Sequence, residues 1–535
     1  MQLGFINAEG TTLGSGIDIT TDGYFWATET FPNKLGPVSI ATLGDSIIIR
    51  HGGGTAFDPF DIGELVNDEV LNGTAGAITN GKGFTGTISP IDSFTNPVTL
   101  DNIQIIPRKP SQTNLPFTRI QVSLPFTNTV GDVDIEITTL DSILSDQFSG
   151  YLGPKPSINN PSDAPKILEQ IEQQTGVKSA FIYATFVGDR LELRLVSAKT
   201  NKLVTVPDAT RDLVVETANK LRREITNPIK RRTTSYIAPS QQLYQWLISP
   251  LQAQLEAEGI QNLVFITDAG LRSLPIAALH DGQGFLVEKY SIGLMPSLSL
   301  TDTTYVDIRN ASVLAMGISE ANDLAKSLNL SPLPSVPIEL QTITALRGGQ
   351  SFLNEKFTEA NLQSQRQGSP IVHLATHGEF KPGPLENSYI LLWDTPLRLN
   401  EVRELGWNQA PAVELLVLSA CKTAAGDEQA ELGFAGFAIQ AGVKSALASL
   451  WYVSDEGTSG LMTEFYGQLQ TASIKAEALR QAQLGMIRGD VRIVEGQLQS
   501  SRGNIALPAI LQGLEDQPLS HPYYWAAFTM IGSPW

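Results

Sequence analysis

The chain has 535 residues, of which 42% are hydrophobic and 17% charged, and this balance excludes a mainly disordered protein. Its one cysteine, Cys421, excludes a disulfide framework and zinc sites built on several cysteines. The net charge of −18 disfavours nucleic acid and anionic membrane surfaces as partners, because a protein binds either of them through a basic surface.

Residues 1–106 read as a β-rich segment. Residues 1–100 hold 16 of the 46 glycines, and glycine, asparagine and aspartate separate short β-forming runs at 16–20, 38–42 and 45–50. Such short runs at regular spacing predict an all-β array, and a solenoid explains both the short strands and the turn-rich breaks.

Two phrases in this segment, IIIRHGGGTAFDPFDIG (47–63) and NGTAGAITNGKGFTGTISP (72–90), resemble the last rungs of filamentous-haemagglutinin-like β-helices. The resemblance implies a β-helix remnant or cap.

Residues 107–118 (PRKPSQTNLPFT) contain three prolines and are predicted to be a linker. Residues 119–159 are predicted to be a short β-rich connecting segment, with strand-like runs at 120–124 and 133–138.

From residue 160 the pattern changes to alternating helices and strands, and a GD pair at 188–189 indicates a hairpin. Nearly continuous apolar runs predict strands that are buried on both faces: 262–267, 312–318, 369–375, 413–420 and 444–451. Helical periodicity is found at 166–176, 213–225, 241–259, 431–442, 460–470 and 475–487. This alternation predicts an α/β fold with a mostly parallel sheet sandwiched by helices.

Reactive residues follow two of the predicted strands. His377 and Gly378 are expected in a loop beyond a strand that ends near Ala375, and Cys421 at the carboxyl tip of a strand that ends near Ala420. A thiol nucleophile needs a base within hydrogen-bond reach, and imidazole is suited to that role. His373 lies inside its predicted strand and is assigned to the core. The pattern H-x-x-x-H is not taken as a metal site, because no glutamate follows the first histidine.

The stretches HLATHGEF (373–380) and LVLSACKTAAGD (416–427) closely resemble the two signature stretches of the CHAT domain family. This family has bacterial and eukaryotic members and is related to caspases, separases and gingipains. Further similar stretches follow in the family's order, at 266–297, 433–455, 475–484 and 521–532. The resemblance covers about residues 160–535 and implies a caspase-like domain with a non-catalytic half (160–300) and a catalytic half (301–535).

The resemblance implies a cysteine endopeptidase that works through a Cys-His dyad. Cys421 is then the nucleophile and His377 the base, and the backbone N–H groups of Gly378 and Cys421 form the oxyanion hole. Asp455 matches the place where separase-like relatives hold an aspartate that faces a basic P1 side chain. A solvated loop carboxylate and a helix cap stay open as other roles for Asp455.

The expected partners are a protein or peptide substrate and an activating protein, and no cofactor or metal is expected. Two other functions stay open: a non-enzymatic scaffold with a caspase-like fold, and a secreted or surface adhesin-type protein. The sequence begins without a basic stretch followed by an apolar one, so we expect a cytoplasmic protein. An upstream signal outside this chain would instead place it at the cell surface or outside the cell.

Overall fold

In this computed structural model the chain divides into two compact units, residues 1–131 and 132–535. The structure describes residues 136–535 except 154, 367, 410, 411 and 424–427, without the side chains of 420–423, 428 and 429. Before residue 136 it describes only the backbone of strands. The predicted linker beyond Pro107 lies outside the described residues.

The described strands of the first unit form three sheets. Parallel pairs join strands that are far apart in sequence: β3 (Ile17–Thr20) pairs with β7 (Ile47–His51), which also pairs with β14 (Ile103–Pro107). Stacked rungs of a solenoid pair in this way. The other strands are β1 (Gln2–Leu3), β2 (Ile6–Ala8), β4 (Trp26–Ala27), β5 (Phe31–Asn33), β6 (Gly36–Thr42), β8 (Phe60–Ile62), β9 (Gly73–Thr74), β10 (Ala77–Thr79), β11 (Thr87–Ile88), β12 (Ser93–Phe94) and β13 (Val98–Leu100). The haemagglutinin-like character of the segment stays a prediction.

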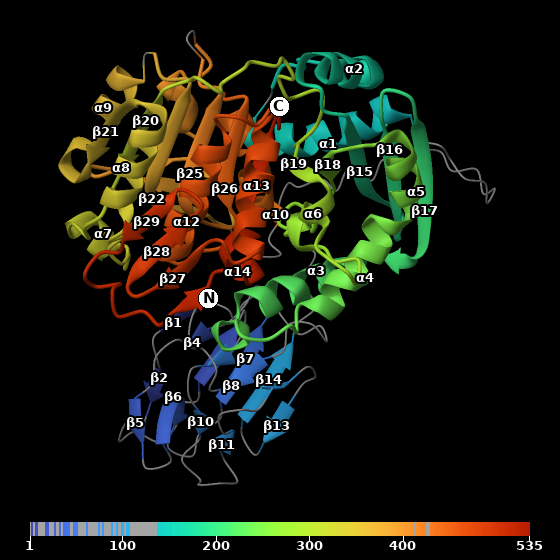
Figure 1. Ribbon diagram of the computed structural model, residues 1–535. Coiled ribbons are helices and arrows are strands. Elements are labelled where there is room, and N and C mark those ends of the chain that lie inside the picture. Colours follow the sequence, from blue (N-terminus) through green and yellow to red (C-terminus); the bar gives the residue numbers. More distant parts are fainter. Residues whose placement is uncertain are drawn as a thin grey trace. The chain divides into compact units, whose positions relative to one another are not determined.

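A 13-stranded sheet is the centre of the described part of the second unit (Figure 1). Its main path runs through β17 (Asn201–Thr210), β16 (Arg190–Val196), β15 (Ser179–Val187), β18 (Asn262–Thr267), β19 (Ser291–Leu294), β31 (Phe528–Gly532), β26 (Ser445–Ser449), β25 (Leu415–Thr423), β22 (Ile371–Phe380), β20 (Val313–Gly317) and β21 (Gly349–Leu353). Strands β23 (Tyr389–Leu391) and β24 (Pro396–Arg398) extend it beside β22. All five predicted apolar strands and the hairpin at 188–189 are confirmed.

The direction of the strands places the predicted pair at one edge of this sheet. Strands β26, β25, β22, β20 and β21 pair in parallel, and β26 pairs antiparallel with β31. The carboxyl ends of β22, β25 and β26 therefore lie side by side. In open α/β sheets this edge is where working residues gather.

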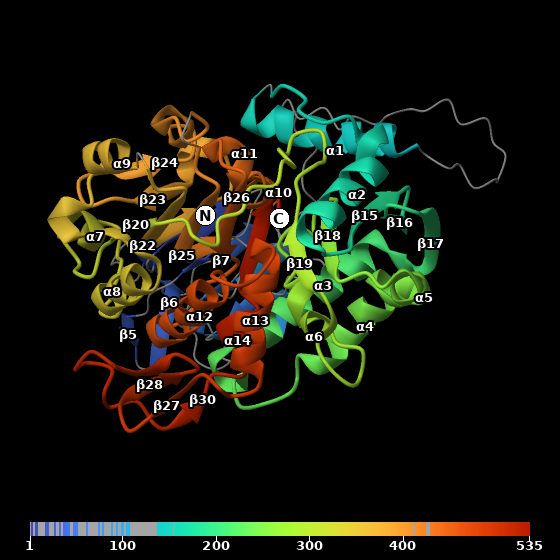
Figure 2. The ribbon, with the colours of Figure 1, turned by 45° about the horizontal axis from the view of Figure 1, so that its top comes forward.

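Helices cover both faces of the sheet, as predicted. On one face α8 (Val336–Arg347), α12 (Asp455–Gln468) and α13 (Lys475–Ile487) pack on the strands, and Figures 1 and 2 show them as one layer. Helices α1 (Ile137–Leu152), α10 (Glu428–Ala435) and α11 (Phe437–Ala441) form another layer. The rest are α2 (Ala164–Thr175), α3 (Arg211–Thr226), α4 (Ile237–Leu247), α5 (Ser249–Glu258), α6 (Leu286–Lys289), α7 (Asp323–Ser327), α9 (Glu359–Gln365) and α14 (Pro522–Trp525).

Helix α1 corrects the predicted β-rich segment 119–159 from Ile137 onwards, whereas its strand-like run at 120–124 lies outside the described residues. The run 133–138 alternates like a strand, but Ile137 begins a helix instead. From there Leu140, Leu144, Phe148 and Leu152 recur every four residues and are all buried. This spacing puts them on one side of a helix, and the burial of that side decides the structure.

Between α13 and α14 in the sequence, the chain forms a second, four-stranded antiparallel sheet, which was not predicted. It contains β27 (Arg492–Val494), β28 (Gln497–Ser500), β29 (Gly503–Ala506) and β30 (Gln517–Pro518).

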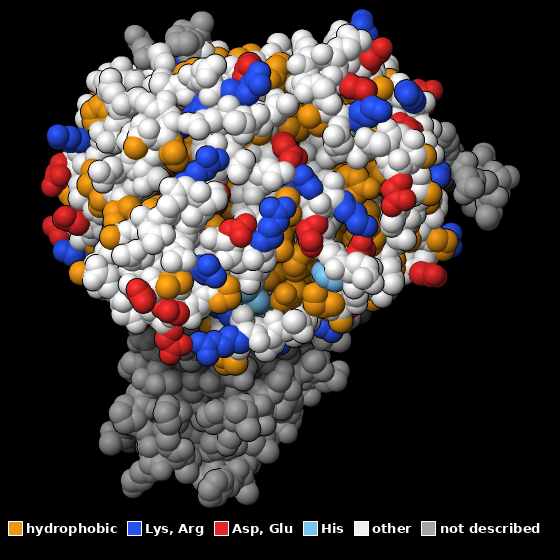
Figure 3. All heavy atoms as spheres, viewed as in Figure 1, with side chains coloured by type: hydrophobic (Ala, Val, Ile, Leu, Met, Phe, Trp, Pro, Cys, Tyr) orange, Lys and Arg blue, Asp and Glu red, His pale blue; other side chains and the backbone are white. Residues whose placement is uncertain are grey.

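No described helix is both long and apolar enough to cross a membrane. On the face of the second unit shown in Figure 3, basic and acidic side chains are interspersed.

The two expected halves of the CHAT-like region share one hydrophobic core, which contains Ile182 and Phe265 as well as Leu374 and Leu418. A buried carboxylate adds a polar link between them. Glu431 of α10, only 1% exposed, accepts hydrogen bonds from the Gly270 backbone N–H (2.8 Å) and the Ser273 hydroxyl (2.5 Å). Gly270 and Ser273 therefore hold the helix that follows Cys421 in sequence.

Glu431→Ala is expected to lower the free energy of unfolding by about 1–3 kcal/mol, because it leaves the buried Ser273 hydroxyl and the part-buried Gly270 N–H without an acceptor. Glu431→Gln keeps a carbonyl acceptor and should cost less. Urea unfolding of the three proteins measures both changes. An alanine variant as stable as the wild type would contradict this role for Glu431.

Candidate active site

The pairing of β22 with β25 brings the two signature stretches together. His377 lies opposite Ala420, and Gly378 lies opposite Cys421. The pairing is regular as far as Leu374, opposite Leu418, and then shifts by one residue before His377. A β-bulge of this kind changes the direction in which the following side chains point, and bulges are frequent beside active sites.

Both strands extend further than the sequence predicted. We expected them to end near Ala375 and Ala420, but β22 continues to Phe380 and β25 to Thr423. Gly378 pairs with Ile390 of β23 as well as with Cys421. The prediction fell short because the additional partner, β23, comes from a later part of the chain.

His377 is buried, with 9% of its surface exposed, and one ring nitrogen is fixed. Its Nε2 lies 2.8 Å from the backbone carbonyl oxygen of Ser331. A carbonyl only accepts, so Nε2 carries the proton in this contact and the neutral ring has Nδ1 as its acceptor. Burial lowers the pKa of His377, and the Ser331 carbonyl partly offsets this effect. The ring is therefore neutral near pH 7 and able to accept a proton at Nδ1.

Two neighbours of His377 were not predicted. The ring of Tyr452 stacks on the imidazole, with centroids 6.2 Å apart and planes 14° apart, although 40% of the tyrosine is exposed. The neighbouring Trp451 is only 5% exposed and donates its Nε1–H to the Tyr523 carbonyl at 3.0 Å, so it is a core residue. Ser331 contacts His377 through a backbone atom, so its residue type could not have predicted the contact. Tyr452 is an aromatic residue just after β26, and this feature can be recognised in the sequence.

His373 belongs to the core, as predicted. It is fully buried, and its two ring nitrogens contact Glu339 Oε1 (2.9 Å) and the Tyr466 hydroxyl (3.1 Å). These contacts join β22 to α8 and α12 and leave no open position on the ring. Among the described residues, no three histidine, cysteine or acidic side chains are grouped to hold a metal ion.

Asp455 is the first residue of α12, in the connection that follows β26. Its Oδ2 accepts the Ser335 backbone N–H at 2.6 Å. Burial raises the pKa of Asp455 to about 6, against the effect of the Ser335 hydrogen bond. The structure thus places Asp455 near the same edge as His377, with one carboxylate oxygen bound to the chain itself.

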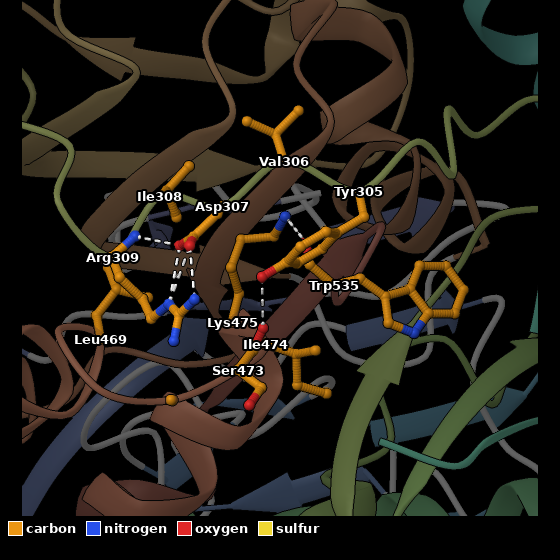
Figure 4. Close-up of a pocket in the computed structure, with 11 residues that line it drawn as sticks. Tyr305, Val306, Asp307, Ile308, Arg309, Leu469, Ser473, Ile474, Lys475 and Trp535 are labelled. Atoms are coloured by element: carbon orange, nitrogen blue, oxygen red, sulfur yellow. Dashed lines mark hydrogen bonds and ion pairs between the residues drawn. The ribbon is translucent and has the colours of Figure 1, made fainter. Parts of the chain in front are cut away.

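A separate hollow lies around Lys475, away from the predicted pair (Figure 4). Lys475 is 3% exposed and donates to the Trp535 carbonyl, while burial lowers its pKa to about 7. Tyr305 closes one side and donates its hydroxyl to the Ser473 carbonyl at 3.1 Å. An ion pair between Asp307 and Arg309 (2.6 Å) forms the rim.

The second unit is thus a mostly parallel α/β sheet with signature histidine and cysteine positions on neighbouring strands. The family model of the CHAT domain matches residues 238–533, more than half of the chain. The protein belongs to the CHAT domain family. The match begins later than residue 160, where we expected the domain to start.

Two similar solved structures are those of the Saccharomyces cerevisiae separase–securin complex. Both are 12% identical in sequence over 70% of this chain, with TM-scores of 0.42 and 0.37. The match covers 31% of the solved chain in each case, so this protein spans about a third of its length. A comparison with curated proteins found no match.

The raised pKa of Asp455 has a consequence for stability. The folded protein binds this proton more tightly than the unfolded chain, whose ordinary aspartate pKa is 3.8. Asp455 therefore stabilises the fold fully below its unfolded pKa, and this contribution is lost as the pH rises through about 6. Asp455→Asn has no carboxyl group to titrate, so this pH-dependent loss of stability is absent. Between about pH 4 and about pH 7 its unfolding free energy should therefore fall less than that of the wild type. Urea unfolding at both pH values measures this, and an equal fall in the two proteins would contradict the shift.

Proposed function

We propose that the protein is a cysteine endopeptidase that cleaves protein substrates through a dyad of Cys421 and His377. The observation that carries this proposal is the register of β22 and β25, which sets Gly378 opposite Cys421 and His377 one residue earlier. Membership of the CHAT family supports it. Activation by a partner protein is the family-derived expectation that goes with this function.

The buried histidine fits the role of base. His377 takes the thiol proton of Cys421 at Nδ1, while the Ser331 carbonyl keeps the other nitrogen protonated. The thiolate attacks the scissile carbonyl, and His377 then gives the proton to the leaving amine. Water hydrolyses the acyl-enzyme, and His377 acts as base again.

The proposed oxyanion hole consists of the backbone N–H groups of Gly378 and Cys421, which lie on neighbouring strands in register. Donors aimed at the developing charge of the tetrahedral intermediate contribute on the order of a few kcal/mol of transition-state stabilisation. A side chain at position 378 would crowd the substrate, so glycine suits this place.

Cys421→Ala is expected to abolish cleavage, because no other thiol is present in the chain. A fluorogenic peptide library that varies P1, treated with wild type and variant, measures this. The fold should be retained, with a circular dichroism spectrum like that of the wild type. Cleavage by Cys421→Ala equal to that by the wild type would contradict the proposed peptidase.

Asp455 is the proposed determinant of a basic P1 preference. Its Oδ2 accepts the Ser335 backbone N–H, and a carboxylate accepts up to about four hydrogen bonds, so Asp455 still has acceptor sites for an arginine side chain. Asp455→Ala is expected to lower the ratio of kcat/KM for arginine over leucine at P1 by at least about tenfold. Matched peptides that differ only at P1 give this ratio. An unchanged ratio would remove Asp455 from the pocket.

A further inference from the structure

One short segment contacts both His377 and Asp455. Residues 331–335, here called the strap, connect α7 to α8. At one end of the strap the Ser331 carbonyl accepts the His377 Nε2–H at 2.8 Å. At the other end the Ser335 N–H donates to Asp455 Oδ2 at 2.6 Å.

The composition of the strap makes it stiff. Pro332 and Pro334 alternate with the other residues, and each proline fixes its own φ and restricts the residue before it. Between them Leu333 is 3% exposed and donates its N–H to the Ser319 carbonyl at 3.1 Å. Because the segment is stiff, a rotation about the fixed Leu333 moves Ser335 and Ser331 together.

The contacts that hold the strap differ in accessibility. Beyond Ser335 the chain enters α8, where Glu339 is 3% exposed and bonds to the buried His373. Leu333 is likewise in the core. Asp455 is only half-buried, so its contact is the one that a proton or a substrate cation reaches from solvent.

We propose that Asp455 is a positioning residue for His377 and acts through the strap. Its ionised carboxylate holds Ser335 by a charge-assisted hydrogen bond, and this keeps the Ser331 carbonyl against Nε2 of His377. Protonation or removal of the carboxylate weakens that bond and frees the ring. The inference rests on the proposed role of His377 as base.

The two charged side chains with the largest described effect on the pKa of Asp455 are both acidic. Glu339 faces it from α8, Glu456 lies beside it on α12, and both favour its protonation, while Tyr452 lies three residues earlier. The hydrogen bond from Ser335 of the strap stabilises the ionised form. A basic P1 side chain would do the same, so substrate of the preferred class would also tighten the strap.

The first test is the turnover of a leucine-P1 peptide, which makes no ion pair with Asp455. Asp455→Asn is nearly the same size but neutral, and Asp455→Ala removes the acceptor. We expect kcat on this peptide to fall in both, by on the order of tenfold or more in the alanine variant, because small misplacements of a base are costly. Loss confined to the arginine peptide, with kcat on leucine unchanged, would overturn the proposal.

The second test does not need activity. Histidine labelled with 13C at Cε1 gives one NMR signal for each of the five histidines, and His377→Gln assigns the signal of His377. In the wild type this signal should titrate below the ordinary histidine range. In Asp455→Asn its pKa should shift from the wild-type value, because the ring loses the Ser331 carbonyl that favours its protonated form and gains contact with solvent. An unchanged titration of His377 would overturn the coupling.

Asp323→Asn is the matched control. Asp323 is also the first residue of a helix, α7, but its side chain is fully exposed and its one ion pair, to Lys326, is long at 3.6 Å. This variant should keep the wild-type kcat and His377 titration. A wild type that waits for an activating partner cleaves no peptide by itself, and the NMR titration then decides whether Asp455 and His377 are coupled.

Discussion

The pairing of β22 with β25 is the constraint on which the rest of the site depends. His377 and Cys421 are far apart in the chain, and only a parallel ladder between buried strands sets their backbones side by side. The ladder is secured by the core on both faces, since β22 and the described part of β25 are buried almost throughout. The bulge before His377 then interrupts the regular alternation of side chains and changes the direction of the His377 side chain.

The environment of His377 favours a base over a fixed positive charge. Burial lowers its pKa, and the Ser331 carbonyl sets which nitrogen carries the proton. A neutral ring of defined tautomer is ready to take a proton from a thiol. The thiolate that forms would in turn stabilise the imidazolium, so the two charges need appear only together. The ring of Tyr452 lies nearly parallel to the imidazole, with the two centroids 6.2 Å apart.

The sequence predicted the framework of the second unit better than the details of the site. The five apolar strands were predicted because residues such as Val372, Leu416 and Leu447 belong to continuous β-forming runs. Helix α1 was missed because its short alternating start resembles a strand, while the spacing of Leu144 and Phe148 becomes decisive only once there is a core to bury them. Local pattern and tertiary burial disagree there, and burial prevails.

The contacts of the site were beyond prediction for a different reason. The hydrogen bonds of Ser331 and Ser335 to His377 and Asp455 use backbone atoms, whose partners depend on the path of the chain and not on residue type. The family resemblance pointed to Cys421, His377 and Asp455, and had no means of showing that one strap connects the last two. The structural role of Glu431 could likewise not be predicted from the sequence, because it depends on hydrogen-bond donors from a distant part of the chain.

The most direct measurement of the central claim is the rate at which iodoacetamide alkylates Cys421 as a function of pH. The chain has one cysteine, so the reagent reports on that thiol alone. With His377 as its base, the thiol should react well below its ordinary pKa of about 8.5, and His377→Ala should move the midpoint back to about that value. The same pH profile in the two proteins would contradict the dyad.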